Sequence, residues 1–266
     1  MKQRTLKELS FERILNGIIR RIKYFPHLIA WNFSIQAKTN CVNIKQFKDL
    51  HKGERCFLIA NGPSLNKTNI NLFKDEITFG LNRIYLNYSK MEFKPTYLVC
   101  INKLVLTQFV DDFNNEKMPK FFNWRCRKEF LNRTDTYFVE KNLFSSKFSE
   151  DISKSLTPAA TVTYAALQII YYMGFSEVII VGMDHNFDSK EKPNKTEIRK
   201  EEVDSNHFAP NYFPKGSKWE TPDLVASDYY YTIARKEFEK DGRFIFDATI
   251  NGKCTIFPKR KLEMFF

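Results

Sequence analysis

The sequence predicts a single α/β domain with a Rossmann-like, mostly parallel sheet, which follows an N-terminal helical appendage and contains a lid. Three observations predict this fold: short apolar runs spaced widely enough for crossover helices, one clear helix, and one long polar segment. The apolar runs are the predicted strands, at Cys56–Ala60, Ile77–Gly80, Tyr97–Ile101, Thr136–Val139, Glu177–Val181 and Arg243–Asp247.

The clearest predicted helix runs from about Ala159 to Met173, where apolar side chains recur every three or four residues. Gly174 follows it, at a position where helices commonly end. The segment 188–218 is polar and contains prolines, and we expect it to be a long lid over an active site.

Residues 1–50 form the predicted appendage, which is basic and helical, and residues 51–266 form the predicted catalytic domain. Along residues 6–25, apolar side chains fall on one stripe of a helix, with basic side chains elsewhere around it. Such a helix lies on an anionic membrane, or it packs on the domain or on a second subunit of a homo-oligomer. The sequence leaves these alternatives open.

Charge and cysteine content narrow the function classes. The formal net charge of +11 indicates an anionic partner, for which a nucleotide-sugar, a membrane surface and nucleic acid are the candidates. The five cysteines are odd in number and lack C-x-x-C spacing, which indicates neither a disulfide framework nor a zinc site. No apolar run approaches a membrane span, and the N-terminus lacks a signal-peptide core. We therefore expect a cytoplasmic protein, at the inner face of the membrane if the helix binds lipid.

The pentad Asn61-Gly62-Pro63-Ser64-Leu65 directly follows the first predicted strand. Gly62 allows the backbone to approach a phosphate closely, and Pro63 is suited to the start of a helix. Asn61 and Ser64 supply short hydrogen-bonding side chains. The pentad therefore predicts a phosphate-facing turn of a nucleotide-handling enzyme, with an ordinary strand-to-helix turn as the alternative.

Polar residues also follow the later strands, and parallel strands would bring all of them to one edge of the sheet. Arg83 offers a planar fork for phosphate, and Asn82 suits a base edge or a ribose. Thr161 and Thr163 stand at the start of the long helix, where free N–H groups favour an anion, although one of them is expected to be only the N-cap. The set at the strand ends is Asn61, Ser64, Asn82, Arg83, Asn102, Asp184 and His185.

The chain has four histidines, of which His27 and His51 fall in the appendage or its linker. His185 and His207 are therefore the two candidates for acid/base chemistry. Asp184 is suited to hold a ribose hydroxyl, a metal ion or His185 itself. No metal ligand set is predicted.

These segments together resemble the MptE-like superfamily, which groups flagellin-modifying motility-associated factors and proteins of surface-polysaccharide loci. The resemblance covers roughly residues 53–262. It rests on Phe57–Leu65, Leu81–Arg83, the helix that ends at Gly174, and Ile179–His185. The superfamily is distantly similar to the sialyltransferases of glycosyltransferase family 42.

That similarity implies a GT-A-like variant fold and inverting transfer from a CMP-activated nonulosonic acid, sialic-acid-like or Kdo-like. The implied acceptor is a glycan or lipid-linked glycan of lipopolysaccharide or capsule. No metal is obligatory, and Mg²⁺ would act only as a stimulator.

The similarity also implies roles for individual residues. The turn Asn61–Ser64 would contact the donor phosphate and sugar, while Asn82 and Asn102 would contact the nucleotide. Thr161 or Thr163 would bind the sugar carboxylate. A lid histidine would be the general base, here His207 with Asn211 near the position of a second one. The candidates to donate a hydrogen bond to the leaving phosphate are Tyr212 and the tyrosines at 229–231.

Two other functions remain open on the sequence alone. ATP-dependent pyrophosphoryl transfer to 6-hydroxymethyl-dihydropterin, the other activity of the family, would need Mg²⁺ held by acids such as Asp184 and Asp188. A non-enzymatic, basic nucleic-acid-binding module is the third reading. We do not expect nucleic acid as the partner, because the basic residues are dispersed and no RNA or DNA motif occurs.

Overall fold

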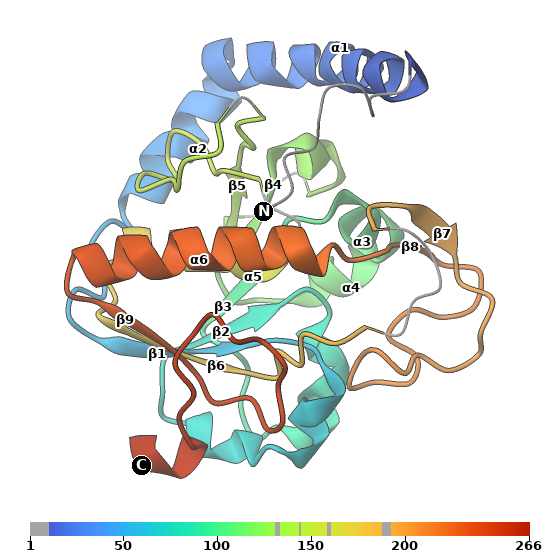
Figure 1. The fold of residues 1–266 in the computed structure, drawn as a ribbon. Helices are drawn as coiled ribbons and strands as arrows, with labels where there is room; N and C mark the ends of the chain where they lie inside the picture. The colour runs from blue at the N-terminus through green and yellow to red at the C-terminus, as the bar shows by residue number, and fades with distance from the viewer. Residues whose placement is uncertain (1–10, 131–133, 144, 159–160, 188–192) are drawn as a thin grey trace.

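The computed structural model describes residues 11–266 except 131–133, 144, 159–160 and 188–192 (Figure 1). A seven-stranded parallel sheet forms its centre. In spatial order the strands are β5 (Thr136–Val139), β4 (Lys120–Asn123), β3 (Tyr97–Cys100), β2 (Thr78–Leu81), β1 (Arg55–Ile59), β6 (Glu177–Val181) and β9 (Phe244–Asp247). The predicted α/β fold with a mostly parallel sheet is confirmed.

The order of the strands reverses beside β1. The chain adds β2, β3, β4 and β5 on one side of β1 and then returns to place β6 on the other side. In open α/β sheets, ligands bind next to the carboxyl ends of the strands at such a reversal. The carboxyl ends of β1 and β6 are therefore the first place to look for a functional site.

Strand β4 was not predicted, because its sequence Lys-Phe-Phe-Asn begins with a charged residue. The side chain of Lys120 is buried, and its Nζ lies 2.8 Å from the carboxylate of Asp135. Nζ also donates to the carbonyl oxygens of Glu116 and Met118, at 2.9 and 3.3 Å. A buried ammonium group needs such partners, and here they allow a lysine to begin an interior strand.

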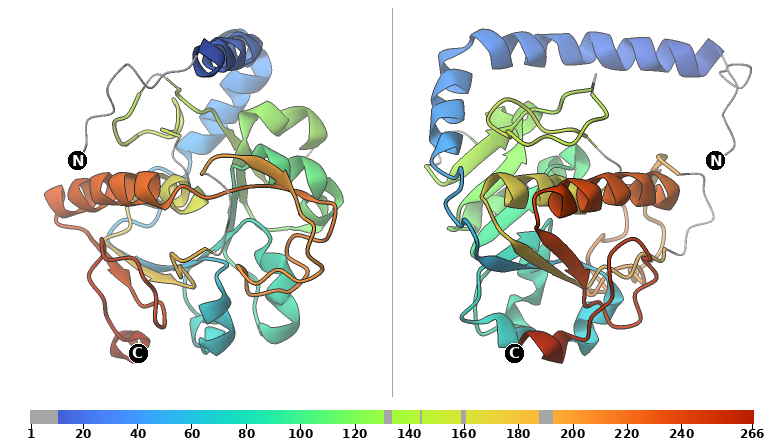
Figure 2. Two further views of the ribbon diagram at one scale, coloured as in Figure 1. Left: turned by 45° about the vertical axis from the view of Figure 1, so that its right-hand side comes forward. Right: turned by 60° about the vertical axis from the view of Figure 1, so that its left-hand side comes forward.

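Helices cover both faces of the sheet (Figures 1 and 2). The helices α5 (Val162–Tyr172) and α6 (Leu224–Lys240) pack on one face, where Leu58, Ile170 and Phe238 belong to one apolar cluster. The other face is covered by α3 (Lys103–Gln108), α4 (Val110–Asn115) and the short 3₁₀ helices η2 (Pro63–Lys67), η3 (Ile70–Phe73), η4 (Ile84–Lys90), η5 (Trp124–Phe130) and η6 (Leu262–Phe265).

Helix α5 confirms the clearest helix prediction over residues 162–172; residues 159–160 lie outside the described residues. Every side chain from Thr163 to Tyr172 is buried, since α5 lies between the sheet and α6. Gly174 follows with φ of +91°, the left-handed conformation that ends many helices and that glycine adopts most easily.

The N-terminal region forms two helices, α1 (Phe11–Phe33) and α2 (Ile35–Lys45). Helix α1 continues past the predicted end, through Pro26, whereas residues 6–10 lie outside the described residues. Ser34 separates the two helices and caps α2, because its Oγ accepts a hydrogen bond of 3.1 Å from the amide of Ala37. None of the described helices is long and apolar enough to cross a membrane.

The segment predicted to be a lid contains more order than its polar composition indicates. It forms β7 (Thr196–Ile198), which pairs antiparallel with β8 (Lys218–Glu220). Phe208 and Phe213 are buried in the cluster on the face of the sheet opposite α5. Residues 188–192 of this segment lie outside the described residues.

Candidate functional site

The turns after β1 and β6 are joined by a carboxylate. The amide of Ser64 donates to Oδ1 of Asp184 at 3.1 Å, and the hydroxyl of Ser64 donates to Oδ2 at 2.6 Å. The amide of Gly62 donates to the carbonyl of Gly182 at 2.8 Å. The backbone N–H that was expected to meet a phosphate therefore meets the side chain of Asp184.

Gly62 is needed at this turn because of Asp184. Its φ of −72° is open to any residue, but a Cβ atom at this position would lie 1.9 Å from Oδ2 of Asp184 and 2.7 Å from the carbonyl oxygen of Gly182. Pro63 begins the 3₁₀ helix η2, as the sequence indicated for a helix start. The space that Gly62 leaves open is thus filled by the carboxylate of Asp184 and not by a ligand phosphate.

Two buried asparagine oxygens at the ends of β1 and β2 have no hydrogen-bond partner. They are Oδ1 of Asn61 and Oδ1 of Asn82. The amide nitrogen of Asn61 donates to the carbonyl of Leu81 at 3.0 Å, which fixes the orientation of that side chain. Asn82 has φ of +44°, a left-handed conformation that asparagine tolerates well. Buried acceptors normally have partners, so both oxygens are candidates to bind a ligand.

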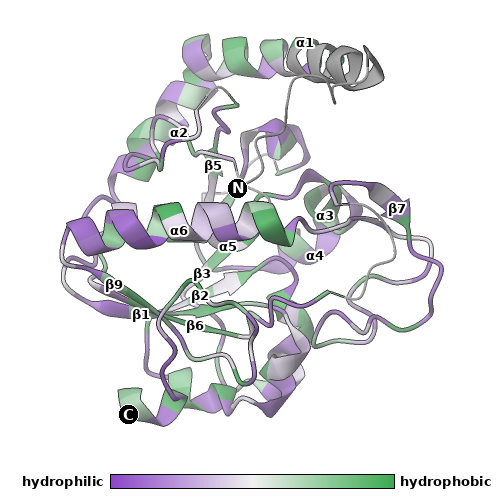
Figure 3. Ribbon diagram, in the orientation of Figure 1, coloured by the Kyte–Doolittle hydropathy of each residue, from purple (hydrophilic) through white to green (hydrophobic). Residues whose placement is uncertain are grey.

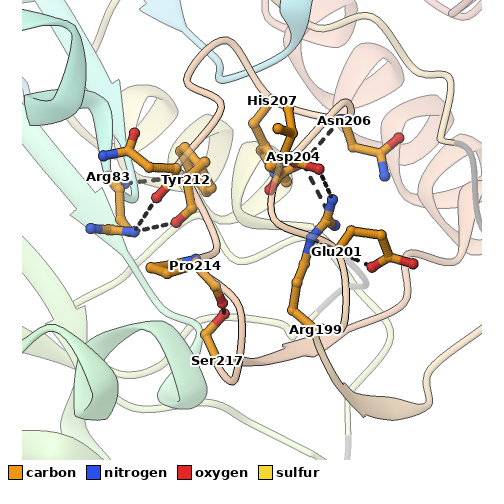
Figure 4. A network of polar contacts seen from close by, with 11 residues as sticks. Arg83, Arg199, Glu201, Asp204, Asn206, His207, Tyr212, Pro214 and Ser217 are labelled. Carbon is orange, nitrogen blue, oxygen red and sulfur yellow. Dashed lines mark hydrogen bonds and ion pairs between the residues drawn. The ribbon is translucent and has the colours of Figure 1, made fainter.

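The side chain of Arg83 makes its contacts with other residues of the protein. This side chain is buried, and its Nη1 donates to the carbonyl of Tyr212 (Figure 4). Its Nε donates to the hydroxyl of Tyr85 at 2.8 Å. The guanidinium also stacks on the ring of Phe109, 3.5 Å from its centroid, and Nη2 lies 3.4 Å from Asp112. The fork expected to hold phosphate instead joins the lid segment to the end of β2.

His207 lies in the lid segment and is held by an aspartate. Its Nδ1 is 2.9 Å from Oδ2 of Asp204, whose side chain is fully buried. Oδ1 of Asp204 accepts the amide hydrogen of Asn206 at 2.9 Å, and Arg199 lies 3.7 Å away (Figure 4). Burial alone raises the pKa of Asp204, but the hydrogen bond and charge of His207, with the Asn206 amide and Arg199, outweigh it and hold this pKa below its ordinary value.

The ring of His207 stacks on the ring of Tyr212, with centroids 4.0 Å apart and an angle of 2° between the planes. Tyr212 is buried, and its hydroxyl accepts a hydrogen bond of 3.3 Å from the amide of Arg83. Burial raises the pKa of Tyr212, so its hydroxyl stays protonated at neutral pH. Tyr212 thus lies beneath His207 and supports it.

Hydrogen bonds fasten the lid segment to the turn after β1. The amide of Phe208 donates to the carbonyl of Asn61 at 2.9 Å, and the side-chain amide of Asn66 donates to the carbonyl of Phe208 at 2.8 Å. His207, the neighbour of Phe208, is therefore anchored at the carboxyl end of β1, close to Asn61.

His185 meets a different aspartate, at the start of α6. Its Nε2 is 2.8 Å from Oδ1 of Asp228, yet Oδ1 makes no contact with hydrogen-bond geometry. The side chain of Asp228 is 45% exposed, which contrasts with the fully buried carboxylate of Asp204. His185 has φ of +53°, and its ring lies 5.9 Å from the ring of Tyr231.

The remaining predicted residues have structural contacts. Thr161 is the N-cap of α5, accepting a hydrogen bond of 3.2 Å from the amide of Thr163, as expected for one of these threonines. The hydroxyl of Tyr231 donates to Thr161 at 3.2 Å, and burial raises the pKa of Tyr231 to about 12. Asn102 caps α3, with Oδ1 accepting from the amides of Leu104 and Val105.

The structure thus brings Asn61, Asn82 and His207 together at one sheet edge and directs Ser64, Arg83 and Asn102 into protein contacts. Sequence reasoning missed Asp204 and Asp228. Asp204 precedes His207 by three residues, a spacing that indicates a His–Asp pair, whereas Asp228 is distant from His185 in the sequence and gives no such signal. Within the described residues, no group of three or more His, Cys, Asp or Glu side chains is arranged to hold a metal ion.

Comparison with known proteins gives a matching family model and a similar solved structure. The family model described as 6-hydroxymethylpterin diphosphokinase MptE-like matches residues 32–190, more than half of the chain. The structure of the MAf glycosyltransferase from Magnetospirillum magneticum AMB-1 is similar, with 15% identity and a TM-score of 0.49. The similarity covers 84% of this chain and 38% of that protein. No curated protein matches the sequence.

Proposed function

We propose that this chain, which belongs to the MptE-like family, is a glycosyltransferase that takes its sugar from a nucleotide-activated donor. In finer terms, we propose inverting transfer from a CMP-activated nonulosonic acid to a hydroxyl group of a surface glycan. The observation that carries the proposal is the His207–Asp204 pair, anchored beside the unpartnered amide oxygens of Asn61 and Asn82.

His207 is suited to act as the general base. When the Asp204 carboxylate accepts a hydrogen bond from Nδ1–H, the lone pair of the imidazole is on Nε2. Nε2 takes the proton of the acceptor hydroxyl, and the buried carboxylate stabilises the resulting imidazolium. The acceptor oxygen bonds to the anomeric carbon on one face while the bond to the donor phosphate breaks on the other, so the configuration inverts.

The two asparagine oxygens are suited to the nucleoside part of the donor. A buried acceptor without a partner costs about 1–3 kcal/mol, and a ligand that donates a hydrogen bond to it recovers that free energy. Ribose hydroxyls and the exocyclic amino group of cytosine are such donors, whereas an ionised phosphate offers only acceptors. This chemistry supports assigning Asn61 and Asn82 to the nucleoside.

Pyrophosphoryl transfer is the second candidate, and the description of the matching family favours it. That reaction uses Mg²⁺ between phosphate oxygens and acidic side chains. Both carboxylate oxygens of Asp184, the acid expected for this role, already accept hydrogen bonds from Ser64. Asp188 lies outside the described residues.

The deciding experiment is a screen of the purified chain against cytidine, uridine, guanosine and adenosine nucleotides and their sugars, with and without magnesium. Calorimetry measures binding, and chromatography measures release of the nucleotide. We expect preference for cytidine monophosphate and slow, metal-independent release of it from an activated nonulosonic acid. Preference for a nucleoside diphosphate sugar would contradict the CMP-activated donor but keep the glycosyltransferase. Turnover of ATP that requires both magnesium and a pterin would contradict glycosyl transfer and support pyrophosphoryl transfer.

A pair of asparagine variants tests the nucleoside assignment. Asn61→Ala is expected to weaken nucleotide binding roughly tenfold, because it removes a buried acceptor that has no hydrogen-bond partner in the protein. Asn123→Ala is the matched control at the end of β4, where both ends of the amide already bind protein, to Ile101 and Arg125. Equal weakening in the two variants would remove Asn61 from the donor site.

A further inference from the structure

Helix α1 carries an apolar stripe that faces away from the protein. Ile22, Phe25, Ile29 and Phe33 recur at three or four residues and therefore share one face of the helix, and each is between 46% and 76% exposed. The stripe of a surface helix normally faces the core. Ile22 and Phe25 belong to the stripe predicted from the sequence, and the structure places both on the outward side of α1 and continues the stripe to Phe33.

The opposite face of α1 is fixed to the domain. Tyr24 and Trp31 are buried, and they donate hydrogen bonds to the carbonyls of Lys141 and Lys154 at 2.7 and 2.9 Å. The indole of Trp124 donates to the carbonyl of His27 at 3.1 Å. A rotation of α1 that buried the stripe would break these three contacts, so the stripe stays outside in the folded domain.

The apolar surface continues onto α2. Ile35 and Val42, seven residues apart and hence on one face of that helix, are 82% and 64% exposed. Figure 3 shows hydrophobic segments along the described part of α1 and on α2, at one end of the molecule. The C-terminal helix η6 lies at the other end (Figures 1 and 2).

The charge of the N-terminal region indicates what kind of partner covers this apolar surface. Residues 1–50 contain ten basic and three acidic side chains, so they carry +7 of the net charge of +11. A second copy docked on the same face would bring the same positive charge to it, whereas an anionic lipid surface offers apolar chains together with negative headgroups. We propose that α1 docks on an anionic membrane, lying parallel to its surface with this stripe among the acyl chains.

The docked helix would turn a particular edge of the sheet toward the bilayer. Tyr24 contacts the segment after the carboxyl end of β5, and His27 contacts Trp124 directly after β4. The β4–β5 end of the sheet therefore lies nearest the docked membrane, and the candidate site at the ends of β1, β2 and β6 lies farther along the same sheet.

Vesicle sedimentation of the full chain tests the proposal. We expect binding to phosphatidylcholine vesicles that contain phosphatidylglycerol, and much weaker binding to phosphatidylcholine alone. Ile22→Ser combined with Phe33→Ser is expected to lower the vesicle partition coefficient at least tenfold, because it removes apolar area from the interface. Lys23→Gln is expected to lower it about fivefold on the anionic vesicles only.

The matched control is Val225→Ser combined with Met264→Ser, two residues that are similarly exposed outside α1 and α2. This control should bind vesicles as the wild type does, and thermal unfolding confirms that each variant is folded. Equal binding by the stripe variant and the control would overturn the proposal. It would also be overturned by a dimer in light scattering that dissociates only in the stripe variant. Neither readout depends on glycosyl transfer.

Discussion

Two His–Asp pairs occur within the described residues, and they differ in burial and in geometry. The His207–Asp204 pair has hydrogen-bond geometry, a fully buried carboxylate, and a tyrosine ring stacked beneath the imidazole. The His185–Asp228 pair has ion-pair distance without that geometry, and the Asp228 side chain is 45% exposed although the Oδ1 that faces His185 is buried. Two pairs with the same residue types therefore offer different chemistry.

The difference shows what a general base requires beyond a titratable ring. The tautomer must be fixed, and the charge that appears on protonation must be stabilised where water screens little. Asp204 meets both conditions for His207, whereas Oδ1 of Asp228, although buried, makes no hydrogen bond of good geometry that would fix the tautomer of His185. The family resemblance already made His207 the expected base, with His185 as the other candidate, and the geometry of the His207–Asp204 pair supports that proposal.

The largest expected effect comes from removing the imidazole of His207. His207→Ala is expected to lower kcat of sugar transfer by about 10²- to 10⁴-fold, the usual contribution of a general base, with donor affinity nearly unchanged. His185→Ala is expected to change kcat far less. Steady-state kinetics with calorimetric donor binding checks both variants. The reverse ranking would transfer the role of base to His185.

Asp204→Asn is expected to have the next largest effect. The asparagine can still accept the amide hydrogen of Asn206, but its NH₂ group then faces Nδ1 of His207 and favours the tautomer with hydrogen on Nε2. We expect kcat to fall by roughly 10²-fold, less than the 10⁴-fold known for a serine-protease triad. The pH–rate profile should lose or shift its acidic limb. If Asp204 had only a structural role, Asp204→Asn would lower the folded fraction and leave the pH–rate profile unchanged.

A substitution in the turn at Gly62 is expected to have a smaller effect, and on stability instead of activity. Gly62→Ala would place a Cβ atom 1.9 Å from Oδ2 of Asp184, and we expect a loss of about 1–3 kcal/mol in the free energy of unfolding. Urea denaturation measures this loss. In an Asp184→Ala background the loss should shrink, because the colliding carboxylate is gone. An equal loss in both backgrounds would mean that the carboxylate is not what excludes a side chain here.

Acid should weaken the lid pair before the rest of the protein unfolds. Because the folded-state pKa of Asp204 lies below its unfolded value of about 4, its stabilisation is complete above pH 4 and is lost as pH falls through the lower folded pKa. The difference in unfolding free energy between wild type and Asp204→Asn should therefore be constant from pH 7 to about 5 and shrink below about 4. A difference that grows in acid would contradict the assignment.

The sequence predicted the sheet well because its strands are short apolar runs with clear ends. The predicted bounds at Thr136–Val139 and Glu177–Val181 coincide with β5 and β6. It missed β4, since no local rule shows that Asp135 and two carbonyl groups will neutralise Lys120. The sequence also predicted an apolar stripe on α1 but not the side toward which it faces. Periodicity defines a face of the helix, and only tertiary contacts decide where that face points.

The position of the candidate site could be predicted from the sequence. The hydrogen-bond partners of its residues were harder to predict. Asn61 and Asn82 follow strands, and a parallel sheet brings such residues to one edge. Arg83 looked free because its partner Tyr212 lies 129 residues away in the chain. Ser64 looked available for phosphate because Asp184, which binds it, follows a strand 120 residues later. Such long-range contacts follow from the fold and not from local spacing.

The smallest expected effect separates the second His–Asp pair from the first. Asp228→Asn removes a half-exposed charge that has no hydrogen-bond geometry, and we expect it to change the free energy of unfolding by less than about 1 kcal/mol. Since Oδ1 of Asp228 makes no hydrogen bond of good geometry to His185, kcat should fall no more than about threefold. Denaturation and kinetics in parallel with Asp204→Asn measure the contrast. If Asp228→Asn cost as much activity as Asp204→Asn, both pairs would belong to one catalytic unit, because solvent exposure alone would then not distinguish them.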